Sequence, residues 1–516
     1  IKEEIFSCDN LIVLEGSVDD LIIKKDKCTG IKLGNGNEVF SNSTVLTTGT
    51  FLRGMIKIGN ESYPAGRIGD KPSVKLAKKI QSLKFSIGRL KTGTPSRIDK
   101  KSINFNNLTE QLPDKKPIPF SFINRFIHIQ QIPCFITSTN SKTHKIINDN
   151  IHLSPMYSGK INSMGARYCP SIEDKVKKFS DKTSHQIFLE PEGLESNIIY
   201  PNGISTSLPE DVQKKFIHSI KGLEKAKIIK PGYAIEYDYV NPQELYHSLE
   251  TKKISNLFFA GQINGTTGYE EAAAQGIIAG INAALKLKKQ ETFVINRSEG
   301  YIGVLIDDLV TKGTKEPYRM FTSRSEYRLT LRSDNADQRL TPIGIKAGCV
   351  LKDRERCFKQ KIRKLKKDFN LIDEKRISPN KLNEFGIKIK KDGKKRTAKD
   401  LLSYQNINFD DLVKIWPDLK SIDGESKEQI IIESQYAGYL KRQREDISDF
   451  RRDEDLKIPH NLDYQKVGSL SNEVVEKLSL IQPPTLGAAS RISGVTPAAI
   501  IALLRHVKRK NNQRGL

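Results

Sequence analysis

The chain has 516 residues, 37% of them hydrophobic, and 85 Lys and Arg against 61 Asp and Glu give it a formal net charge of +24. This length is enough for roughly two to four domains and at least one large core. No apolar run approaches the roughly 18 residues that a membrane span needs, so the composition fits a soluble globular protein without a membrane partner. The charge favours a polyanionic partner, nucleic acid first, although Lys, Ile and Asn are abundant throughout and compositional drift explains the charge as well.

Cysteine and histidine usage argues against a disulfide framework and against a metal site. The cysteines form no CxxC pair and no zinc-type spacing; they are Cys8, Cys28, Cys134, Cys169, Cys349 and Cys357. They are typical of thiols in a reducing compartment. His144, His152 and His185 are scattered, so we predict no metal, and no G-x-S-x-G elbow supports serine chemistry.

The first fifty residues read as short strands separated by turns. Leu11–Leu14, Asp20–Ile23 and Gly30–Leu33 are apolar, and the glycines and asparagines of residues 34–37 predict a hairpin turn. Residues 45–50 (VLTTGT) predict a buried strand that ends in Thr-Gly. A meander followed by such a strand is typical of flavoproteins with two dinucleotide folds. In those proteins a GxGxxG unit precedes the meander; here none does and Ile1 opens in mid-pattern, so we expect an N-terminally truncated chain.

The next segments alternate glycine-rich stretches with helical and mixed patterns. Ser73–Leu83 has helical spacing of its apolar residues. Residues 100–230 are mixed and predict an insertion, and residues 231–290 return to an α/β pattern. After about residue 300, amphipathic helices and Lys/Arg clusters dominate, and Thr496-Pro497 predicts the start of a helix with its body at 498–507.

The most informative segment is residues 261–276 (GQINGTTGYEEAAAQG). An apolar strand, Leu257–Ala260, leads into it and a helix of small residues, Ile277–Leu287, leads out. A buried strand ending in glycines brings backbone N–H groups close to a bound anion or ring, and the positive end of the following helix points to the same place. Gln262 and the glycines are therefore candidates for flavin contact, and Glu270 and Glu271 stand where a helix favours carboxylates. A tight strand–helix turn without a ligand is the alternative.

Two further segments carry candidate chemistry. Cys169 lies between Arg167 and Pro170, and a nearby cation lowers a thiol pKa, although composition alone favours a buried structural cysteine. Residues 317–332 interleave arginines with Tyr318, Phe321 and Tyr327, which suits phosphate contact with base stacking; a solvated helix or strand face explains the pattern equally well.

Several long motifs together resemble the GidA/MnmG family, the tRNA uridine 5-carboxymethylaminomethyl modification enzymes. They are residues 47–52, 88–95, 167–175, 185–193, 200–207, 231–237, 261–276, 314–319 and 490–499. The resemblance spans nearly the whole chain. It implies an α/β, glutathione-reductase-like FAD domain that lacks its N-terminal nucleotide-binding unit, an inserted α+β domain and a C-terminal all-helical domain.

The resemblance also implies an activity and partners. Such enzymes use FAD and NADH to add an aminomethyl or carboxymethylaminomethyl group to C5 of the wobble uridine (position 34) of certain tRNAs. The one-carbon unit comes from methylenetetrahydrofolate. The enzyme is a homodimer that forms a heterotetramer with an MnmE-type GTPase, in the cytoplasm or, for organellar relatives, the mitochondrial matrix.

Site residues are carried over by position. The FAD contacts implied are Val18, Ser73, Gly261, Gln262, Gly265 and Gly268. The nicotinamide segment comprises Gly165, Ala166, Tyr168, Pro170, Ser171, Ile172, Glu173, Asp174, Lys175 and Phe179. Cys169 and Arg167 are implied to be catalytic, and Arg319, Arg324 and Arg328 to bind RNA. A thiolate that adds at uracil C6 makes C5 nucleophilic toward a methylene electrophile, reduced flavin supplies the electrons or carries the carbon, and backbone N–H groups near Gln262 stabilise charge on it.

We expect five segments. These are residues 1–95 and 231–300 as the two parts of the FAD domain, 96–230 as the insertion with the NADH segment, 301–435 as a helical tRNA-binding region, and 436–516 as the helical domain that binds the GTPase.

Three other functions compete with this one. The first is a folate- and FAD-dependent tRNA uracil-C5 methyltransferase, and the second a non-catalytic tRNA-binding scaffold. The third is a small-molecule flavin disulfide reductase, which predicts a CxxxxC pair that the chain does not show.

Overall fold

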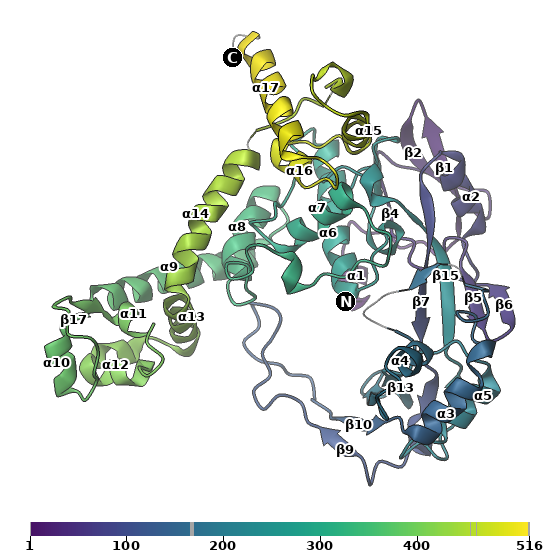
Figure 1. The fold of residues 1–516 in the computed structure, drawn as a ribbon, viewed down its shortest axis with the longest axis horizontal. Helices are drawn as coiled ribbons and strands as arrows, with labels where there is room; N and C mark the ends of the chain where they lie inside the picture. Colours follow the sequence, from purple (N-terminus) through teal and green to yellow (C-terminus); the bar gives the residue numbers. More distant parts are fainter. Residues whose placement is uncertain (1, 162, 166–169, 455, 461, 514–516) are drawn as a thin grey trace. The chain divides into compact units, whose positions relative to one another are not determined.

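The computed structural model describes residues 2–161, 163–165, 170–454, 456–460 and 462–513 (Figure 1). These residues form two compact units. The first extends to Phe120 and adds Phe126–Phe293 and Lys312–Arg319; the second comprises Ser121–Arg125, Val294–Thr311 and the chain from Met320 onward.

The first unit opens with a short helix, α1 (Lys2–Phe6), and a three-stranded antiparallel meander. Its strands are β1 (Val18–Lys24), β2 (Lys27–Leu33) and β3 (Glu38–Phe40). The predicted turn at residues 34–37 joins β2 to β3. The predicted helix is confirmed as α2 (Val74–Ser82), with Ser73 as its N-cap and Leu83 as its C-cap. Ion pairs of 2.7 Å and 2.9 Å from Lys75 and Lys79 to two aspartates of β1 hold α2 against the meander.

The predicted strand at Leu11–Leu14 is wrong. These residues have no regular secondary structure, and their side chains are exposed, Ile12 by 81%. A strand needs a neighbour for its N–H and C=O groups, and residues 11–17 pair with no strand in the described part of the chain. An apolar run alone therefore does not specify a strand.

The strand of residues 45–50 is β4 (Thr44–Leu46), and it pairs in parallel with β16 (Leu257–Phe259). The register sets Val45 opposite Phe258, although more than two hundred residues separate them in the sequence. After β16 the chain forms a 3-10 turn, η4 (Gly261–Asn264), and then helix α6 (Tyr269–Leu287), which begins eight residues before the expected body at Ile277.

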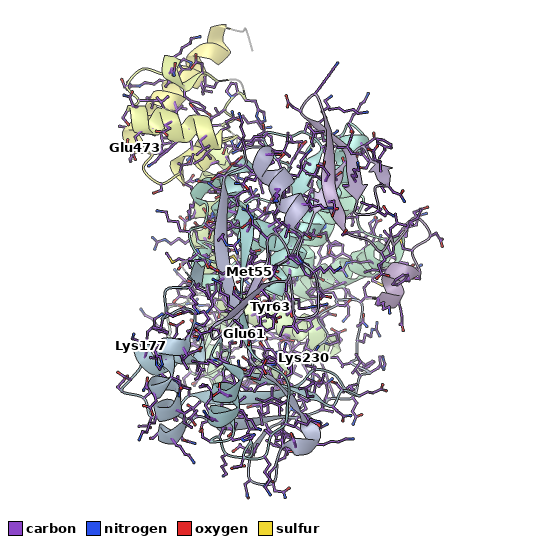
Figure 2. The ribbon with its side chains drawn as sticks, turned by 90° about the vertical axis from the view of Figure 1, so that its right-hand side faces the viewer. Met55, Glu61, Tyr63, Lys177, Lys230 and Glu473 are labelled. Carbon is purple, nitrogen blue, oxygen red and sulfur yellow. The ribbon has the colours of Figure 1, made fainter. Side chains whose placement is uncertain are left out.

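A five-stranded sheet forms the centre of the first unit, in the order β11-β7-β15-β5-β6. Its strands are β5 (Met55–Ile58), β6 (Glu61–Pro64), β7 (Ile87–Thr94), β11 (Met164–Gly165) and β15 (Tyr233–Val240). Figure 2 shows Met55, Glu61 and Tyr63 on the β5–β6 hairpin at the edge of this sheet. Because Thr94 of β7 pairs with Tyr233 of β15, the chain leaves and re-enters this sheet at adjacent points.

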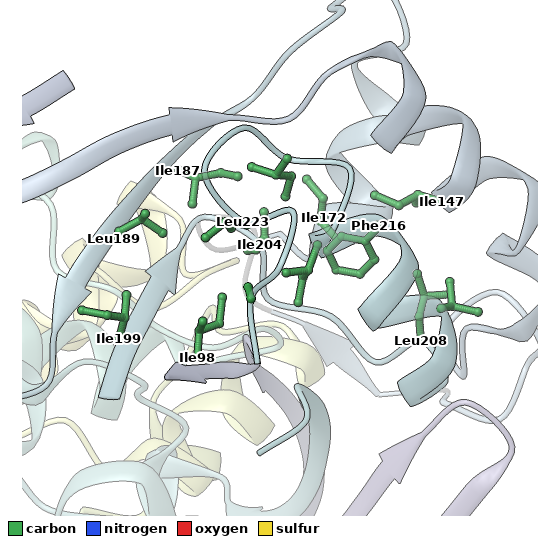
Figure 3. Close-up of a cluster of buried hydrophobic side chains, with 14 of the residues drawn as sticks. Ile98, Ile147, Ile172, Ile187, Leu189, Ile199, Ile204, Leu208, Phe216 and Leu223 are labelled. Atoms are coloured by element: carbon green, nitrogen blue, oxygen red, sulfur yellow. The ribbon is translucent and has the colours of Figure 1, made fainter. Parts of the chain in front are cut away.

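The chain segment between Thr94 and Tyr233 forms a six-stranded antiparallel sheet with its own core. Its strands are β8 (Arg97–Asp99), β9 (Thr109–Gln111), β10 (Cys134–Ser138), β12 (Gln186–Pro191), β13 (Ile198–Asn202) and β14 (Ile228–Lys230). Helices α3 (Ser141–Asp149), α4 (Ile172–Lys178) and α5 (Glu210–Ile217) contribute Ile147, Ile172 and Phe216 to the buried cluster in Figure 3. This compact core makes the segment a structural module inserted into the first unit.

The second unit is mainly helical. Its helices are α7 (Tyr301–Lys312), α8 (Ala336–Ala347), α9 (Lys352–Glu374), α10 (Pro379–Glu384), α11 (Ala398–Leu401), α12 (Phe409–Ile415), α13 (Gly424–Gln435), α14 (Ala437–Glu454), α15 (Asn472–Ile481), α16 (Leu486–Ser490) and α17 (Pro497–Gln513). A two-stranded sheet of β17 (Arg376–Ile377) and β18 (Arg396–Thr397) interrupts the helices. The predicted start at Thr496-Pro497 is confirmed, since α17 begins at Pro497.

Two separate cores stabilise this unit. One gathers side chains from α9 to α13, including the fully buried Leu401 and Leu412. The other lies among α15, α16 and α17, with Leu478 and Leu503 fully buried. Buried ion pairs add to them: Arg297, 1% exposed, donates to Asp307 and Asp308 of α7 at 3.1 Å and 2.8 Å.

Candidate functional site

The candidate site lies where β4 and β16 end side by side. Three glycines there adopt positive φ values: 57° at Gly49, 84° at Gly261 and 78° at Gly265. L-residues rarely adopt this region. At Gly265 a Cβ atom would also lie 2.5 Å from Thr314 Cγ2, so this turn requires glycine. The two strand ends therefore turn sharply at the same edge of this strand pair.

Polar side chains converge on these turns. A Cβ atom on Gly49 would lie 3.6 Å from Gln262 Oε1, so Gln262 reaches across to the end of β4. Tyr237 of β15 is fully buried; burial raises the pKa of its hydroxyl, the nearby Gln262 side chain opposes that rise, and the hydroxyl has no hydrogen-bond partner among the described residues. The Thr48 hydroxyl is buried and has no hydrogen-bond partner among the described residues.

A buried amide network fixes the turn that follows Gly261. The Asn264 Nδ2 atom donates to the Phe259 carbonyl and to Gln275 Oε1, both at 2.8 Å. The Gln275 Nε2 atom donates to Thr266 Oγ1 at 3.0 Å. Because Gln275 belongs to α6, the network locks the turn to the helix.

The opening of α6 is held by a charged contact. Gly268 is the N-cap residue of α6. It has no side chain, so the first N–H groups of the helix have no side-chain acceptor at the N-cap position. Arg319 Nη2 lies 2.7 Å from Glu270 Oε1, and Arg319 Nε lies 3.4 Å from the buried Glu271. Arg319, predicted to bind RNA, thus also clamps the start of this helix.

The predicted FAD contacts Val18 and Ser73 lie on the meander and on α2. Val18 opens β1, which α2 packs against. The Ser73 N–H donates to the Phe51 carbonyl at 2.8 Å, which ties α2 to the loop that follows β4. Ser73 is the N-cap of α2, but its side chain makes no capping hydrogen bond.

These residues fit a flavin. Turns that tolerate only glycine allow close approach of a planar ring, and the partnerless Thr48 hydroxyl and the uncapped N-terminus of α6 offer polar groups to it. The fit rests on geometry and polarity alone.

The predicted nicotinamide segment is partly outside the described residues, which exclude Ala166, Arg167, Tyr168 and Cys169. Gly165 ends β11 beside Lys91 of β7. Pro170 precedes Ser171, whose hydroxyl accepts from the Asp174 N–H and caps α4. Lys175 donates to the Gly203 carbonyl at 2.8 Å, and Phe179 is exposed.

Three members of this segment have structural partners. Ile172 is fully buried in the core of the inserted module. Glu173 is also fully buried, and its Oε1 accepts from Thr206 Oγ1 and from the Ser207 N–H, both at 3.0 Å. Asp174 accepts from the Tyr157 hydroxyl at 2.9 Å. Their assignment to nicotinamide binding stays a prediction, but their side chains already stabilise the module.

The arginines of residues 317–332 fall in two different units and have different partners. Arg319 belongs to the first unit, whereas Arg324 and Arg328 belong to the second. Arg332 pairs with Asp334 at 2.9 Å and with Glu433 at 2.6 Å, so it has a structural role. Arg328 is exposed. The predicted stacking partner Tyr327 packs edge-on against Phe450, with ring centroids 5.6 Å apart.

Comparison with known proteins decides the family. The family model described as glucose inhibited division protein A matches residues 1–291. Two models for the C-terminal helical parts of the tRNA modifying enzyme MnmG/GidA match residues 352–444 and 446–515. The chain belongs to the GidA family. It combines the mixed α/β sheets and the C-terminal helical domain that the sequence predicts.

Relatives of known name and structure support the assignment. The chain is 47% identical to the tRNA uridine 5-carboxymethylaminomethyl modification enzyme MnmG of Granulibacter bethesdensis, over 99% of this chain and 82% of that protein. Two crystal forms of Aquifex aeolicus GidA match with TM-scores of 0.90 and 0.89 and with 43% and 44% identity. They cover 98% of this chain and 81% and 82% of theirs.

Sequence reasoning missed several residues of this GidA-family site. Thr48 and Tyr237 lie within motifs on which the family resemblance rests. Nothing in their local sequence pattern indicated that they lie near the same turns. Asn264 and Gln275 lie in the central segment, where Gln262 and the glycines form the stronger pattern. A buried amide pair eleven residues apart across a strand–helix turn is the signal that could have found them.

The structure also shows the surroundings of two histidines and of the cysteines. His144 and His185 stack with ring centroids 5.1 Å apart, and the Thr139 hydroxyl lies 2.8 Å from His144 Nε2. Burial lowers the pKa of both rings. Within the described ranges no cluster of three or more His, Cys, Asp or Glu side chains is placed to hold a metal. Cys28 is buried and Cys134 partly buried, whereas Cys8, Cys349 and Cys357 are exposed free thiols.

None of the helices in the described part of the chain is long and apolar enough to span a membrane.

Proposed function

We propose that this protein uses FAD and NADH to add an aminomethyl or carboxymethylaminomethyl group to C5 of the wobble uridine of certain tRNAs. The one-carbon donor is methylenetetrahydrofolate, and the enzyme acts in the cytoplasm as a homodimer with an MnmE-type GTPase. The name of the Granulibacter relative, matched over 99% of this chain, supports the substrate and the reaction. The observation that carries flavin dependence is the edge formed by Gly49, Gly261 and Gly265 with the partnerless Thr48 hydroxyl.

The residues at this edge have separable tasks toward the flavin. The N-terminus of α6 and the N–H groups after Gly261 stabilise negative charge on the ring system. Gln262 would orient the ring by hydrogen bonding, and the buried Tyr237 lies near the Gln262 side chain. When bound, the flavin supplies the reducing electrons or carries the one-carbon unit.

Cys169 is proposed as the nucleophile that adds to C6 of the uracil ring, with Arg167 beside it to favour the thiolate. Both lie outside the described residues. The flanking structure is well defined, since Gly165 ends β11 and Ser171 caps α4.

Within the same proposal, residues 1–95 and 231–300 form the FAD domain and residues 96–230 carry the NADH segment. Residues 301–435 bind tRNA, and residues 436–516 bind the GTPase. The C-terminal assignment is consistent with a self-contained core among α15, α16 and α17.

The test is flavin binding and chemistry in the same preparation. The purified protein is expected to show the absorbance of bound oxidised flavin and to lose it when NADH is added. A Cys169→Ser variant is expected to keep the flavin and its reduction but to lose tRNA modification. A preparation that binds no flavin refutes the proposal, and a fully active Cys169→Ser variant removes the thiol from the reaction.

A further inference from the structure

A groove of about 810 Å³ in the second unit is lined by residues of the loop that precedes α7, of helix α8 and of helix α14. Figure 1 labels these three helices. The residues that give it its charge are Arg339, Arg444, Arg451 and Arg452. Glu299 is the acidic residue among the lining side chains, all of which are described, and its Oε2 accepts from the Asn296 N–H at 2.9 Å. The groove is therefore strongly positive.

The basic wall of the groove is one face of α14. Arg444, Ser448, Arg451 and Arg452 follow the spacing i, i+4, i+7, i+8, which places them on the same side of a helix. Ile447, on the same face, is buried and anchors the helix. The arginines stand exposed around this apolar contact.

The loop that contains Thr330 lines the groove opposite the arginines and is held to α14 by hydrogen bonds. Gln443 Oε1 accepts from the N–H of Thr330 at 2.8 Å and from its hydroxyl at 2.6 Å, which docks α14 on this loop. Asn335 Nδ2 donates to the Thr330 carbonyl at 3.0 Å, and Asn335 Oδ1 accepts from Arg339 Nε at 2.9 Å. The guanidinium of Arg339 is thus held in place by this chain of contacts.

The charges in the groove are incompletely neutralised. Arg339 donates to the carbonyls of Glu299 and Arg332 and to the Asn335 amide, all of them uncharged acceptors. Burial and the neighbouring Arg332 lower the pKa of Arg339, and the nearby Asp334 and Asp337 offset only part of that effect. Arg451 forms no ion pair with any residue in the described ranges, and the contact of Arg444 with Glu433 is long, at 3.8 Å.

Arg452, by contrast, lies 2.8 Å from Asp449 on the surface of the same helix. A salt bridge at this level of exposure is weak and does not remove the cation from a competing anion.

We propose that this groove binds the phosphate backbone of the RNA substrate. Guanidinium groups match phosphate oxygens in geometry and charge. None of the described residues that line the groove is aromatic, so its chemistry suits phosphates and not stacked bases. The inference rests on the proposed function, which supplies a tRNA as the ligand, and it extends the tRNA-binding surface beyond residue 435 to α14, which the segment assignment gives to the GTPase.

One of the arginines predicted to bind RNA lies close to this groove. Burial raises the pKa of the Tyr301 hydroxyl, and Arg328 and Arg339 both oppose that rise, so both cations lie near the same ring. Arg328 is exposed and can extend the positive surface beyond Arg339. The groove and Arg328 would then contact successive phosphates.

The test compares an Arg444→Gln, Arg451→Gln double variant with Arg442→Gln. Arg442 is exposed on α14 but does not line the groove, since it lies two positions before Arg444 and therefore on the opposite face of the helix. All replaced side chains are exposed, so folding is preserved, which circular dichroism checks. Binding of an unmodified tRNA transcript is measured over a series of salt concentrations.

The double variant is expected to bind roughly tenfold more weakly, with the slope of log K against log salt reduced by about 1.4–1.8, because two phosphate contacts are lost. Arg442→Gln is expected to match the wild type. Equal binding by wild type and double variant overturns the groove assignment alone. A wild-type protein that binds no tRNA overturns the proposed function as well, and a double variant that loses only GTPase binding assigns the groove to the protein partner.

Discussion

Replacing Gly265 by Ala tests whether the turn after β16 depends on a left-handed residue. Its φ is 78°, and a Cβ atom would lie 2.5 Å from Thr314 Cγ2 and 3.2 Å from Tyr239 Cδ2. The left-handed backbone costs about 1–2 kcal/mol and the overpacking about 1–3 kcal/mol, which gives a loss of about 2–5 kcal/mol in the free energy of unfolding. Urea denaturation followed by circular dichroism measures it.

Gly276→Ala is the matched control. Gly276 lies in α6, a Cβ atom added to it would meet no other atom within 4 Å, and its φ is not positive. The same substitution there is expected to stabilise the protein by up to about 1 kcal/mol through helix propensity. Thr314→Ser, added to the Gly265→Ala variant, removes the clashing methyl group and is expected to restore only the steric part of the lost stability. If Gly265→Ala costs no more than Gly276→Ala, the reasoning about this turn is wrong.

Three further predictions follow from other contacts. Glu173→Ala leaves the Thr206 hydroxyl and the Ser207 N–H without their acceptor, so thermal denaturation is expected to show a loss of about 2–4 kcal/mol, and an unchanged melting temperature would contradict the role of Glu173 in the module. Arg297→Met removes a guanidinium that the buried Asp307 and Asp308 share, while Asp307 keeps its ion pair with Arg491 at 2.6 Å, and is expected to cost about 3–5 kcal/mol in urea denaturation. The exposed pair of Arg356 and Asp353 is expected to contribute almost nothing in an Arg356→Met variant. Burial lowers the pKa of His144 and His185 in the folded state, so the unfolded chain binds protons at these residues at a higher pH than the folded chain does. The free energy of unfolding is therefore expected to fall as the pH drops below about 6.5. A His144→Gln, His185→Gln variant should lack this contribution if the reasoning holds.

The local elements of this fold are largely predictable from the sequence. Ser73–Leu83 has helical spacing with a serine before it, and α2 occupies Val74–Ser82. Gly34–Asn37 and Thr496-Pro497 carry turn and cap signals that depend on neighbouring residues only. Such signals predict the observed structure because only residues close in the sequence take part in these turns and caps.

What depended on distant partners was not predictable. The exposed Leu11–Leu14 shows that apolar residues become a strand only where a neighbour pairs with them. The stacking of His144 on His185 arises because α3 and the start of β12 meet across the inserted module. The sequence offered no sign of that meeting.

The candidate site divides in the same way. The glycines of residues 261–276 signalled a turn, but the pairing of β4 with β16, which brings Gly49 and Thr48 to it, spans more than two hundred residues. The arginines of residues 317–332 looked equivalent, yet Arg332 is neutralised by Asp334 and Glu433 while Arg328 is exposed. Charge alone does not separate structural from ligand-binding arginines; their partners do.

The central claim is that this protein modifies the wobble uridine of tRNA with the help of a flavin held by the turns after β4 and β16. The most direct measurement is mass analysis of wobble nucleosides from cells that lack their own enzyme of this family and express this protein. The account predicts that the 5-aminomethyl or 5-carboxymethylaminomethyl uridine reappears with the wild type and not with the Cys169→Ser variant. Wobble uridines that stay unmodified while the wild-type protein is folded and flavin-bound would contradict it.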